Sequence, residues 1–285
     1  MKVSEIINTE DISKIVKFFK DNSVEQPKID ELKKQYEVTE HPVFDEAQRP
    51  KRKILNDDGQ TDRLEDVNRL GLPFQKRIVN SSVSFLFGNP VKIICPASTE
   101  NEKGAIESIK KILNKNKINS FNRRIARDLF RSTQVAEIWF RTGEQTDPKH
   151  RDYGFETPYR IKVVKFSPWD SDELYPYFDQ YGDMTAFCRG YSRKVENKTV
   201  KYFAVYTDEE YRLYEQADSG WKQADFAVAD IKKIPVVFAQ EEQPDWADVQ
   251  SAIERLEYLL SNFADTNDYH GNPKIFIQGN ITGFA

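Results

Sequence analysis

One stretch near the end of the sequence, from Gln243 to Asn272, limits the possible folds most strongly because it has the pattern of a single long helix. Asp245 is a good N-cap behind Pro244, and Gly271 with Pro273 ends the helix. At about 1.5 Å per residue, roughly 25 helical residues span about 38 Å. A narrow apolar seam of heptad-like spacing consists of Val249, Ile253, Leu256, Leu260 and Phe263. We therefore expect this helix to pack against one neighbouring element.

The charge of the same stretch is lopsided. Between Glu241 and Asp268 there are eight acids and a single base, Arg255. We assign the acidic face of the helix to Glu254, Glu257, Asp265 and Asp268. A helix this long, acidic and narrowly amphipathic needs a partner.

The composition describes a folded chain with a large solvated surface. Of the 285 residues, 39% are hydrophobic and 31% are charged, which allows a sizeable core. The formal net charge of −4 argues against general affinity for nucleic acid. There is no apolar run long enough to cross a membrane and no signal peptide, so we expect no membrane partner. Cys95 and Cys188 offer no disulfide framework, which favours two buried thiols in a reducing cytosol.

Helical periodicity dominates the first half of the chain. We expect helices over residues 8–20, 27–37, 72–88 and 102–117, and a further helix capped by Asn119 or Ser120. Residues 41–62 lose this periodicity and contain the basic run RPKRK at 49–53. A solvated loop is the favoured interpretation, and the alternative is an arm that contacts a partner subunit or a phosphate backbone.

The helix that begins near Ser120 carries an arginine-rich face. Its apolar residues recur every fourth position, and its other faces hold Arg123, Arg124, Arg127 and Arg131. Such a face could bind phosphate, but exposure to solvent or ion pairs between subunits fit it better.

From Gln134 onward the hydrophobic period changes to two, which is typical of strands. The expected strands are Val135–Arg141, Tyr159–Phe166, Met184–Arg193, Thr199–Thr207, Tyr211–Gln216, a short piece around Trp221, and Ile234–Ala239, with an earlier short strand at Val91–Cys95. Sequential short strands with tight turns favour an antiparallel meander. The fold class is therefore α+β, with helices first, then a mainly antiparallel sheet, then the long protruding helix.

Signals for an enzyme are sparse. The three histidines stand alone, and no phosphate-binding loop, dinucleotide-binding motif or paired-cysteine motif occurs, so we expect no cofactor, no metal and no catalytic centre. The acidic segment 167–184 leaves one alternative, a metal-dependent nuclease that would use Asp170, Asp172 and Asp179. A turn anchored by aromatic residues is the favoured interpretation of that segment.

Four stretches together resemble the portal proteins of tailed bacteriophages and prophages, which connect head and tail. They are KRIVNSSVSFLFGNPVKI at 76–93, SPWDSDELYPYFDQYGD at 167–183, KIPVVFAQEEQPDW at 233–246 and VQSAIERLEYLLSNFADTNDYHGNPKIFIQG at 249–279. No short motif among them is diagnostic. The order and content of the whole, over about residues 70–285, carry the resemblance.

The resemblance implies three regions. Residues 1–240 look like a wing-like α+β domain, in which residues 1–65 hold N-terminal helices and the basic loop. Residues 241–271 look like a stem-like acidic helix, and residues 272–285 like the start of a clip-like region with a terminal strand. The family continues with a second stem helix, a tunnel loop and a crown. We expect these to be missing here, which leaves open whether the shortened chain closes a ring by itself.

In that family, subunits assemble into a ring, commonly of twelve, at one vertex of the capsid. The resemblance implies that double-stranded DNA is packaged and ejected through the ring, and that the terminase packaging motor docks on it. It also implies contacts with other copies, with the head–tail connector or adaptor and with capsid proteins. The expected locations are the virion and, during assembly, the bacterial host cytoplasm. A phage structural interaction protein without a channel is a further alternative.

The acidic helix suits a conduit for DNA. Each contact with a DNA phosphate adds binding free energy that moving DNA must overcome, so an acidic passage with few bases keeps friction low. The alternative use of the acids is ion pairing with the arginine-rich face at 123–131 of a neighbouring subunit. Both uses remain expectations at this point.

Overall fold

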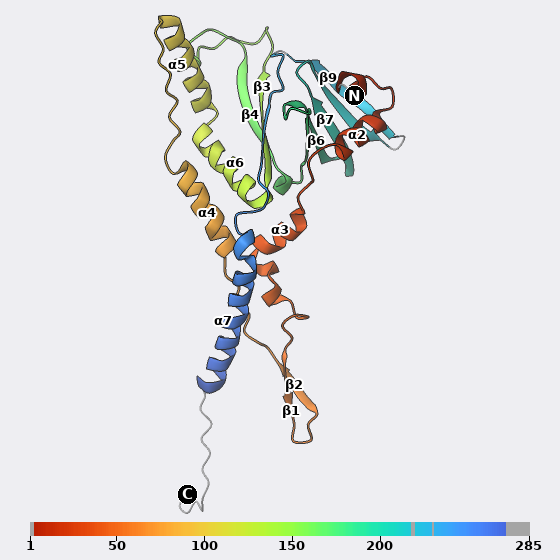
Figure 1. Ribbon diagram of the computed structural model, residues 1–285, viewed down its shortest axis with the longest axis vertical. Coiled ribbons are helices and arrows are strands. Elements are labelled where there is room, and N and C mark those ends of the chain that lie inside the picture. The colour runs from red at the N-terminus through yellow and green to blue at the C-terminus, as the bar shows by residue number, and fades with distance from the viewer. Residues whose placement is uncertain (1–2, 218–219, 230, 272–285) are drawn as a thin grey trace, which may run out of the picture. The chain divides into compact units, whose positions relative to one another are not determined.

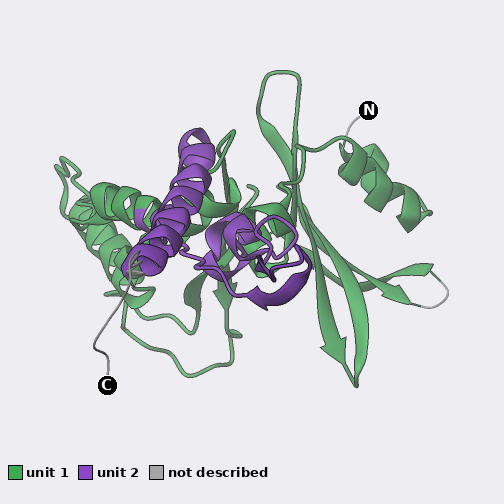
Figure 2. Ribbon diagram, turned by 90° about the horizontal axis from the view of Figure 1, so that it is seen from below, with its two compact units in different colours: residues 1–32, 78–245 green, residues 33–77, 246–285 purple. Residues whose placement is uncertain are grey.

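The computed structural model describes residues 3–217, 220–229 and 231–271. The chain divides into two compact units, shown in green and purple in Figure 2. Unit 1 comprises residues 1–32 and 78–245, and unit 2 comprises residues 33–77 and 246–285. The long acidic helix therefore shares its unit with an N-terminal segment that we assigned to the wing-like region. The expected clip-like region at 272–285 lies outside the described residues.

The largest element of unit 1 is a five-stranded antiparallel meander in which each strand pairs with the next along the chain (Figure 1). Its strands are β5 (Glu173–Phe178), β6 (Met184–Val195), β7 (Lys198–Tyr206), β8 (Glu210–Ala217) and β9 (Gly220–Val228). The β6–β7 connection is a two-residue turn, Glu196-Asn197, in which both residues have positive φ. This left-handed pair matches the right-handed twist of the strands and fixes their register.

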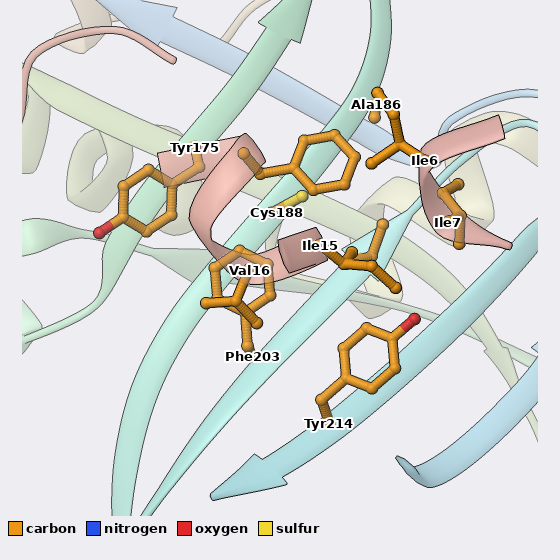
Figure 3. Packing of buried hydrophobic residues seen from close by; sticks show 11 residues of the cluster. Ile6, Ile7, Ile15, Val16, Tyr175, Ala186, Cys188, Phe203 and Tyr214 are labelled. Atoms are coloured by element: carbon orange, nitrogen blue, oxygen red, sulfur yellow. The ribbon is translucent and has the colours of Figure 1, made fainter. Parts of the chain in front are cut away.

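Two short helices cover one face of this meander. Helix α1 (Val3–Ile7) precedes α2 (Ile12–Asp21), whose N-cap Asp11 accepts a hydrogen bond from the Ser13 amide. Ile15, Val16 and Phe19 recur on one face of α2 and are buried against the sheet. Figure 3 shows this core, in which the α1 and α2 side chains meet residues from β5, β6, β7 and β8. Burial of this apolar face holds the N-terminal helices in place.

A second sheet in unit 1 has the strand order β10-β3-β4 and is also antiparallel. Its strands are β3 (Gln134–Thr142), β4 (Arg160–Phe166) and β10 (Val236–Gln240). A second core joins the two sheets and contains Ala136, Ile138, Phe166, Leu174, Phe187 and Val236. The 3-10 helix η3 (Pro168–Asp170) connects β4 to β5.

Three consecutive helices come directly before β3 in the chain. They are α4 (Phe74–Phe87), α5 (Glu100–Lys115) and α6 (Ile118–Ser132), which packs against β3. Helix α5 starts with a complete capping box between Thr99 and Glu102, which satisfies free amides of its first turn. Helix α6 starts differently from the expectation. Its N-cap is Lys117 in the left-handed conformation, so neither Asn119 nor Ser120 caps it, because both are already inside the helix.

Unit 2 contains the end of α3 (Ile29–Tyr36), the 3-10 helices η1 (Val38–Glu40), η2 (Pro42–Phe44) and η4 (Ala247–Val249), a hairpin, and the long helix. The hairpin pairs β1 (Arg52–Leu55) with β2 (Thr61–Glu65). The long helix is α7 (Gln250–Gly271), which the sequence predicted. Its start was predicted wrongly, because Asp245 does not cap it and η4, with Trp246 as its N-cap, comes before it. In Figure 1 it is the dark blue helix.

The fold class is confirmed as α+β with antiparallel sheets, but further local predictions were wrong. Cys95 is exposed, although both thiols were expected to be buried. Residues 91–95 form no strand, because Pro90 and Pro96 bracket them and no other described strand pairs with them. Residues 52–65 form a hairpin inside the expected loop, because Asn56 and Gly59 close the turn between the strands. The acidic segment contains β5, in which Tyr175 is buried and Tyr177 is partly buried in the core that α2 covers. Within the described part of the chain, no helix is both long and apolar enough to cross a membrane.

Candidate functional site

The site that the sequence singled out is α7 together with the segment of unit 2 that runs beside it. Trp246, just before the helix, is fully buried and donates its indole N–H to the Gln35 side-chain oxygen at 2.9 Å. Its ring lies 5.4 Å from that of Tyr36. A buried aromatic residue with a satisfied N–H therefore anchors the start of the helix on the end of α3.

A polar ladder holds α7 against residues 68–72. The backbone N–H groups of Leu72, Leu70 and Asn68 donate to Glu257 Oε1, Ser261 Oγ and Asp265 Oδ1, at 2.7, 2.9 and 2.7 Å. The residue numbers run in opposite directions, so the segment is antiparallel to the helix.

The spacing explains why this ladder can form. Alternate residues of an extended chain advance about 6.6 Å, and every fourth residue of an α-helix advances about 6.0 Å. Side chains at 257, 261 and 265 therefore meet N–H groups at 72, 70 and 68 in step. A backbone segment that forms no sheet or helix thereby finds partners for its amides, which would be costly to bury alone. The sequence contains a signal for this ladder, because polar residues occupy positions i, i+4 and i+8 of α7. The charge pattern predicted Glu257 and Asp265 only as members of an acidic face.

At the upper rung of the ladder, Glu257 also contacts His41. The imidazole Nδ1 lies 2.7 Å from Glu257 Oε1, and Nε2 lies 2.8 Å from the Gln35 carbonyl oxygen. Both side chains are about 1% exposed. No pattern in the sequence connects these two ionisable residues, which are separated by more than two hundred positions.

At the lower rung, Arg49 contacts the acidic side chain, as His41 does at the upper rung. Its Nη1 donates to Asn262 Oδ1 at 2.7 Å, its Nε donates to the Asn68 carbonyl at 2.8 Å, and its Nη2 pairs with Asp265. Asp268 accepts a further hydrogen bond from the Asn68 side chain at 2.7 Å. The first residue of the basic run is therefore a structural member of unit 2, which the interpretation as a solvated loop missed.

Lys51 and Arg52 of the basic run form ion pairs with residues nearby in the chain. Lys51 lies 2.8 Å from Asp66, and Arg52 lies 3.0 Å from Glu65 across the hairpin. The carboxylate of Asp66 holds the pKa of Lys51 above its usual value by hydrogen bonding and charge attraction. These pairs are exposed, and each adds little to stability.

The apolar seam mostly faces away from the ladder. Ile253 is 6% exposed and belongs to the inner side, while Leu260 is half-buried. Together with Leu259, the remaining seam residues form an outer stripe, which consists of Val249, Leu256, Leu259 and Phe263. Phe263 is 70% exposed. Helix α7 thus has a polar face bound to its own chain and an apolar face that the described residues leave exposed.

The four acids of the predicted acidic face have different surroundings. Glu257 is fully buried and differs from the expectation, because its carboxylate is used by His41 and by the Leu72 amide. Asp265 is held by Arg49 and Asn68. Glu254 is half-buried, and Asp268 is exposed at its position beside Asn68. The expected roles of these acids in a channel or between copies stay a prediction.

The arginine-rich face of α6 lies in unit 1. Arg123 and Arg124 are exposed, and Arg123 donates to the Phe87 carbonyl at 3.0 Å. Arg127 is half-buried. Arg131 is used within its own unit, since it pairs with the buried Asp128 at 2.6 Å and stacks on Trp169. The face is therefore smaller than the sequence suggested, and its contact with another subunit stays a prediction.

The carboxylates of the nuclease alternative do not converge on one point. Asp170 pairs with Lys165, Asp172 pairs with Arg189 at 2.7 Å, and Asp179 accepts two backbone N–H groups of the β5–β6 turn. Among the described residues, no group of three or more His, Cys, Asp or Glu side chains is arranged to hold a metal ion. Each carboxylate has a structural role, and the geometry gives the nuclease alternative no support.

Helix α7 is therefore anchored by its polar face and exposes an apolar stripe on the opposite side. The comparisons specify the class. Residues 17–283 match the model of the family described as phage portal protein, SPP1 Gp6-like. The match covers most of the chain, and the chain therefore belongs to this family of phage portal proteins. No curated protein matches it.

Proposed function

We propose that the chain is a subunit of a homo-oligomeric ring, commonly of twelve in the family, at a capsid vertex. Double-stranded DNA is packaged and ejected through this ring without sequence specificity. The terminase motor, the head–tail connector or adaptor and the capsid proteins dock on its outside. The subunit assembles in the bacterial host cytoplasm and resides in the virion. Membership of the portal family supports this proposal.

The observation that carries the proposal is the outer stripe of α7. A solvated helix normally exposes polar residues, yet α7 uses its polar side chains internally and exposes Leu256, Leu259 and Phe263. This arrangement is useful when a neighbour covers the apolar residues. In a ring, the neighbour is another copy of α7 or of the unit that carries it.

The acids then have two uses. Those in the ladder fix α7 to its own unit, and those left accessible, such as Asp268 and Glu254, keep the helix surface free of strong phosphate contacts. A conduit needs both a rigid wall and a surface that does not hold DNA. The role is geometric and electrostatic, and we assign no catalytic residue to it.

The direct test is to image the purified protein by negative-stain microscopy and to measure its mass by native mass spectrometry. We expect closed rings with a central hole and one discrete stoichiometry. Particles that remain monomeric at all accessible concentrations would contradict the proposal. DNA cleavage with Mn²⁺ that is lost in Asp170→Ala would instead revive the nuclease alternative.

A further inference from the structure

The hairpin β1–β2 projects from the rest of unit 2 as an arm (Figure 1). Its two strands are exposed along their length except for Ile54 and Glu65, which are half-buried. A two-stranded hairpin is marginally stable in water unless it packs against another element. The sequence of this region is compatible with a solvated loop or with an arm that contacts a partner, and a paired, largely exposed hairpin favours the arm.

One face of the hairpin carries two exposed leucines. Leu64 lies opposite Lys53, and Leu55 lies two residues farther along the strand that contains Lys53. Residues that are opposite each other across two strands, and alternate residues of one strand, share a face of the sheet. Leu55 and Leu64 therefore lie on the same face, and each is 58% exposed. This face needs a cover from outside the hairpin.

The hairpin is fastened to the face of α7 that lies opposite the outer stripe. Arg49, just before β1, pairs with Asp265, and Asn68, just after β2, donates its backbone N–H to the same carboxylate. Asp265 belongs to the ladder, and the outer stripe faces away from the ladder. Both ends of the hairpin are therefore held on the ladder face, and Phe263 of the stripe stays 70% exposed. A hairpin that covers the stripe has to come from another copy.

Charge favours such a contact. Arg255, the single base between Glu241 and Asp268, is exposed and lies next to the stripe, one turn before Leu259. Residues 56–62 form the tip of the hairpin and contain no base. Their three acids are Asp57, Asp58 and Asp62. An acidic tip beside an apolar face is complementary to a lone guanidinium group beside an apolar stripe.

The spacing of these groups also agrees on the two surfaces. Along α7, Leu259 and Phe263 lie about 6 Å and about 12 Å beyond Arg255. Along the hairpin, Leu55 lies two residues behind the acidic tip, at about 7 Å. Leu64 pairs with a residue four positions behind the tip, at about 13 Å. A hairpin that lies along α7 with its tip at Arg255 therefore brings each leucine beside one apolar residue of the stripe.

We propose that the β1–β2 hairpin of one copy lies along the outer stripe of α7 in the neighbouring copy. The two surfaces are different patches of the same unit, so the contact is head-to-tail and generates rings or filaments. Each copy gives one arm and receives another, which supplies the packing that an isolated hairpin lacks. The inference rests on the proposed ring and names the occupant of the stripe.

Cysteine cross-linking tests the contact in the full-length chain. Cys95→Ser removes the exposed native thiol, and Cys188 stays because its buried thiol is inert. In this background, Leu55→Cys places one thiol in the hairpin and Leu259→Cys places one in the stripe. The matched control combines Leu55→Cys with Ser251→Cys, which is on α7 but outside the stripe. All three introduced cysteines replace exposed residues, so the variants should fold normally.

Each variant is treated with a short bismaleimide, and the products are resolved by denaturing electrophoresis. The Leu55→Cys, Leu259→Cys pair should give covalent dimers and higher species, with at least roughly tenfold more product than the control, because docked thiols share a high effective concentration. Leu259→Cys alone should give no dimer, and a dimer from it would mean that a second α7 covers the stripe, which overturns the contact. Rings in the microscope with equal or absent cross-linking in the pair and the control would also overturn it and leave the proposed function standing. A wild-type protein that forms no oligomer would overturn both.

Discussion

His41 and Glu257 are hydrogen-bonded to each other in the interior of unit 2, with Nδ1 and Oε1 2.7 Å apart. The imidazole Nε2 lies against the Gln35 carbonyl, which can only accept, so Nε2 carries a hydrogen. Glu257 Oε1 already accepts the Leu72 amide and still lies 2.7 Å from Nδ1. That contact needs one proton between Nδ1 and Oε1, which either side chain can carry, while Glu257 Oε2 is buried without a hydrogen-bond partner. This buried hydrogen bond therefore links the start of η2 and the first rung of the ladder to the middle of α7.

Removal of one member of this pair should be costly. His41→Ala leaves the Glu257 carboxyl group buried without this hydrogen-bond partner, and we expect a loss of about 1–3 kcal/mol in the unfolding free energy of unit 2. Glu257→Gln should cost less than Glu257→Ala, because the amide oxygen can still accept the Leu72 N–H. Urea denaturation measures these losses. The control is His270→Ala at the exposed end of α7, and a His41→Ala loss no larger than that of the control would contradict the pair.

The ladder predicts a local effect at its central rung. Ser261→Ala leaves the Leu70 amide without its acceptor, and we expect a loss of about 1–3 kcal/mol. Hydrogen exchange followed by NMR should show faster exchange at Leu70 than in the wild type, with smaller changes elsewhere. Ser251→Ala, on an exposed position of the same helix, is the control and should leave the Leu70 rate unchanged.

Two glycines give opposite predictions for the same substitution. A Cβ on Gly71 would lie 2.5 Å from Val38 Cγ1 and 2.6 Å from Phe44 Cε2, so Gly71→Ala should destabilise unit 2 by about 1–3 kcal/mol. Gly104 lies inside α5 with open space around it, and Gly104→Ala should stabilise the helix by about 0.5–1 kcal/mol. Thermal unfolding of the two variants measures both signs. A neutral Gly71→Ala would show that residues 38 and 71 are not closely packed.

These contacts mark the limit of what the sequence could predict. Periodicity placed α7, the α4 helix and most strands well, because those elements bury regular apolar faces. It missed β5, whose aromatic residues look like turn anchors until α2 covers them. It also missed the ladder, because a segment that satisfies its amides with side chains carries no period of its own. Only one half of the pattern, the polar positions of α7, was visible in advance.

The link between α2 and the sheet should depend on pH. Glu173 accepts hydrogen bonds from Lys20 at 2.7 Å and from Tyr175 at 2.9 Å. Burial raises the pKa of Glu173, but these partners outweigh it and hold the pKa below its usual 4.5. Because the folded-state pKa is depressed, the stabilisation is fully present above the unfolded pKa and is lost as pH falls through the folded pKa. The melting temperature of the wild type should therefore fall toward that of Glu173→Gln between about pH 6 and about pH 3. A constant difference across that range would contradict the assignment.

The outer stripe gives a cleaner test of assembly than the seam residue nearest the ladder. Ile253→Lys would place an ammonium group at a position that is 6% exposed within its own unit, so any loss of assembly could come from unfolding. Phe263→Lys changes a residue that is exposed in the single chain, and we expect normal folding by circular dichroism. It should weaken association between copies at least about tenfold, which corresponds to about 1.4 kcal/mol, because a charge replaces apolar area that a neighbour would bury. Ser251→Lys adds the same charge to an exposed position outside the stripe and should leave assembly intact. Analytical ultracentrifugation compares the two, and equal effects would mean that charge alone, rather than the apolar stripe, controls the association.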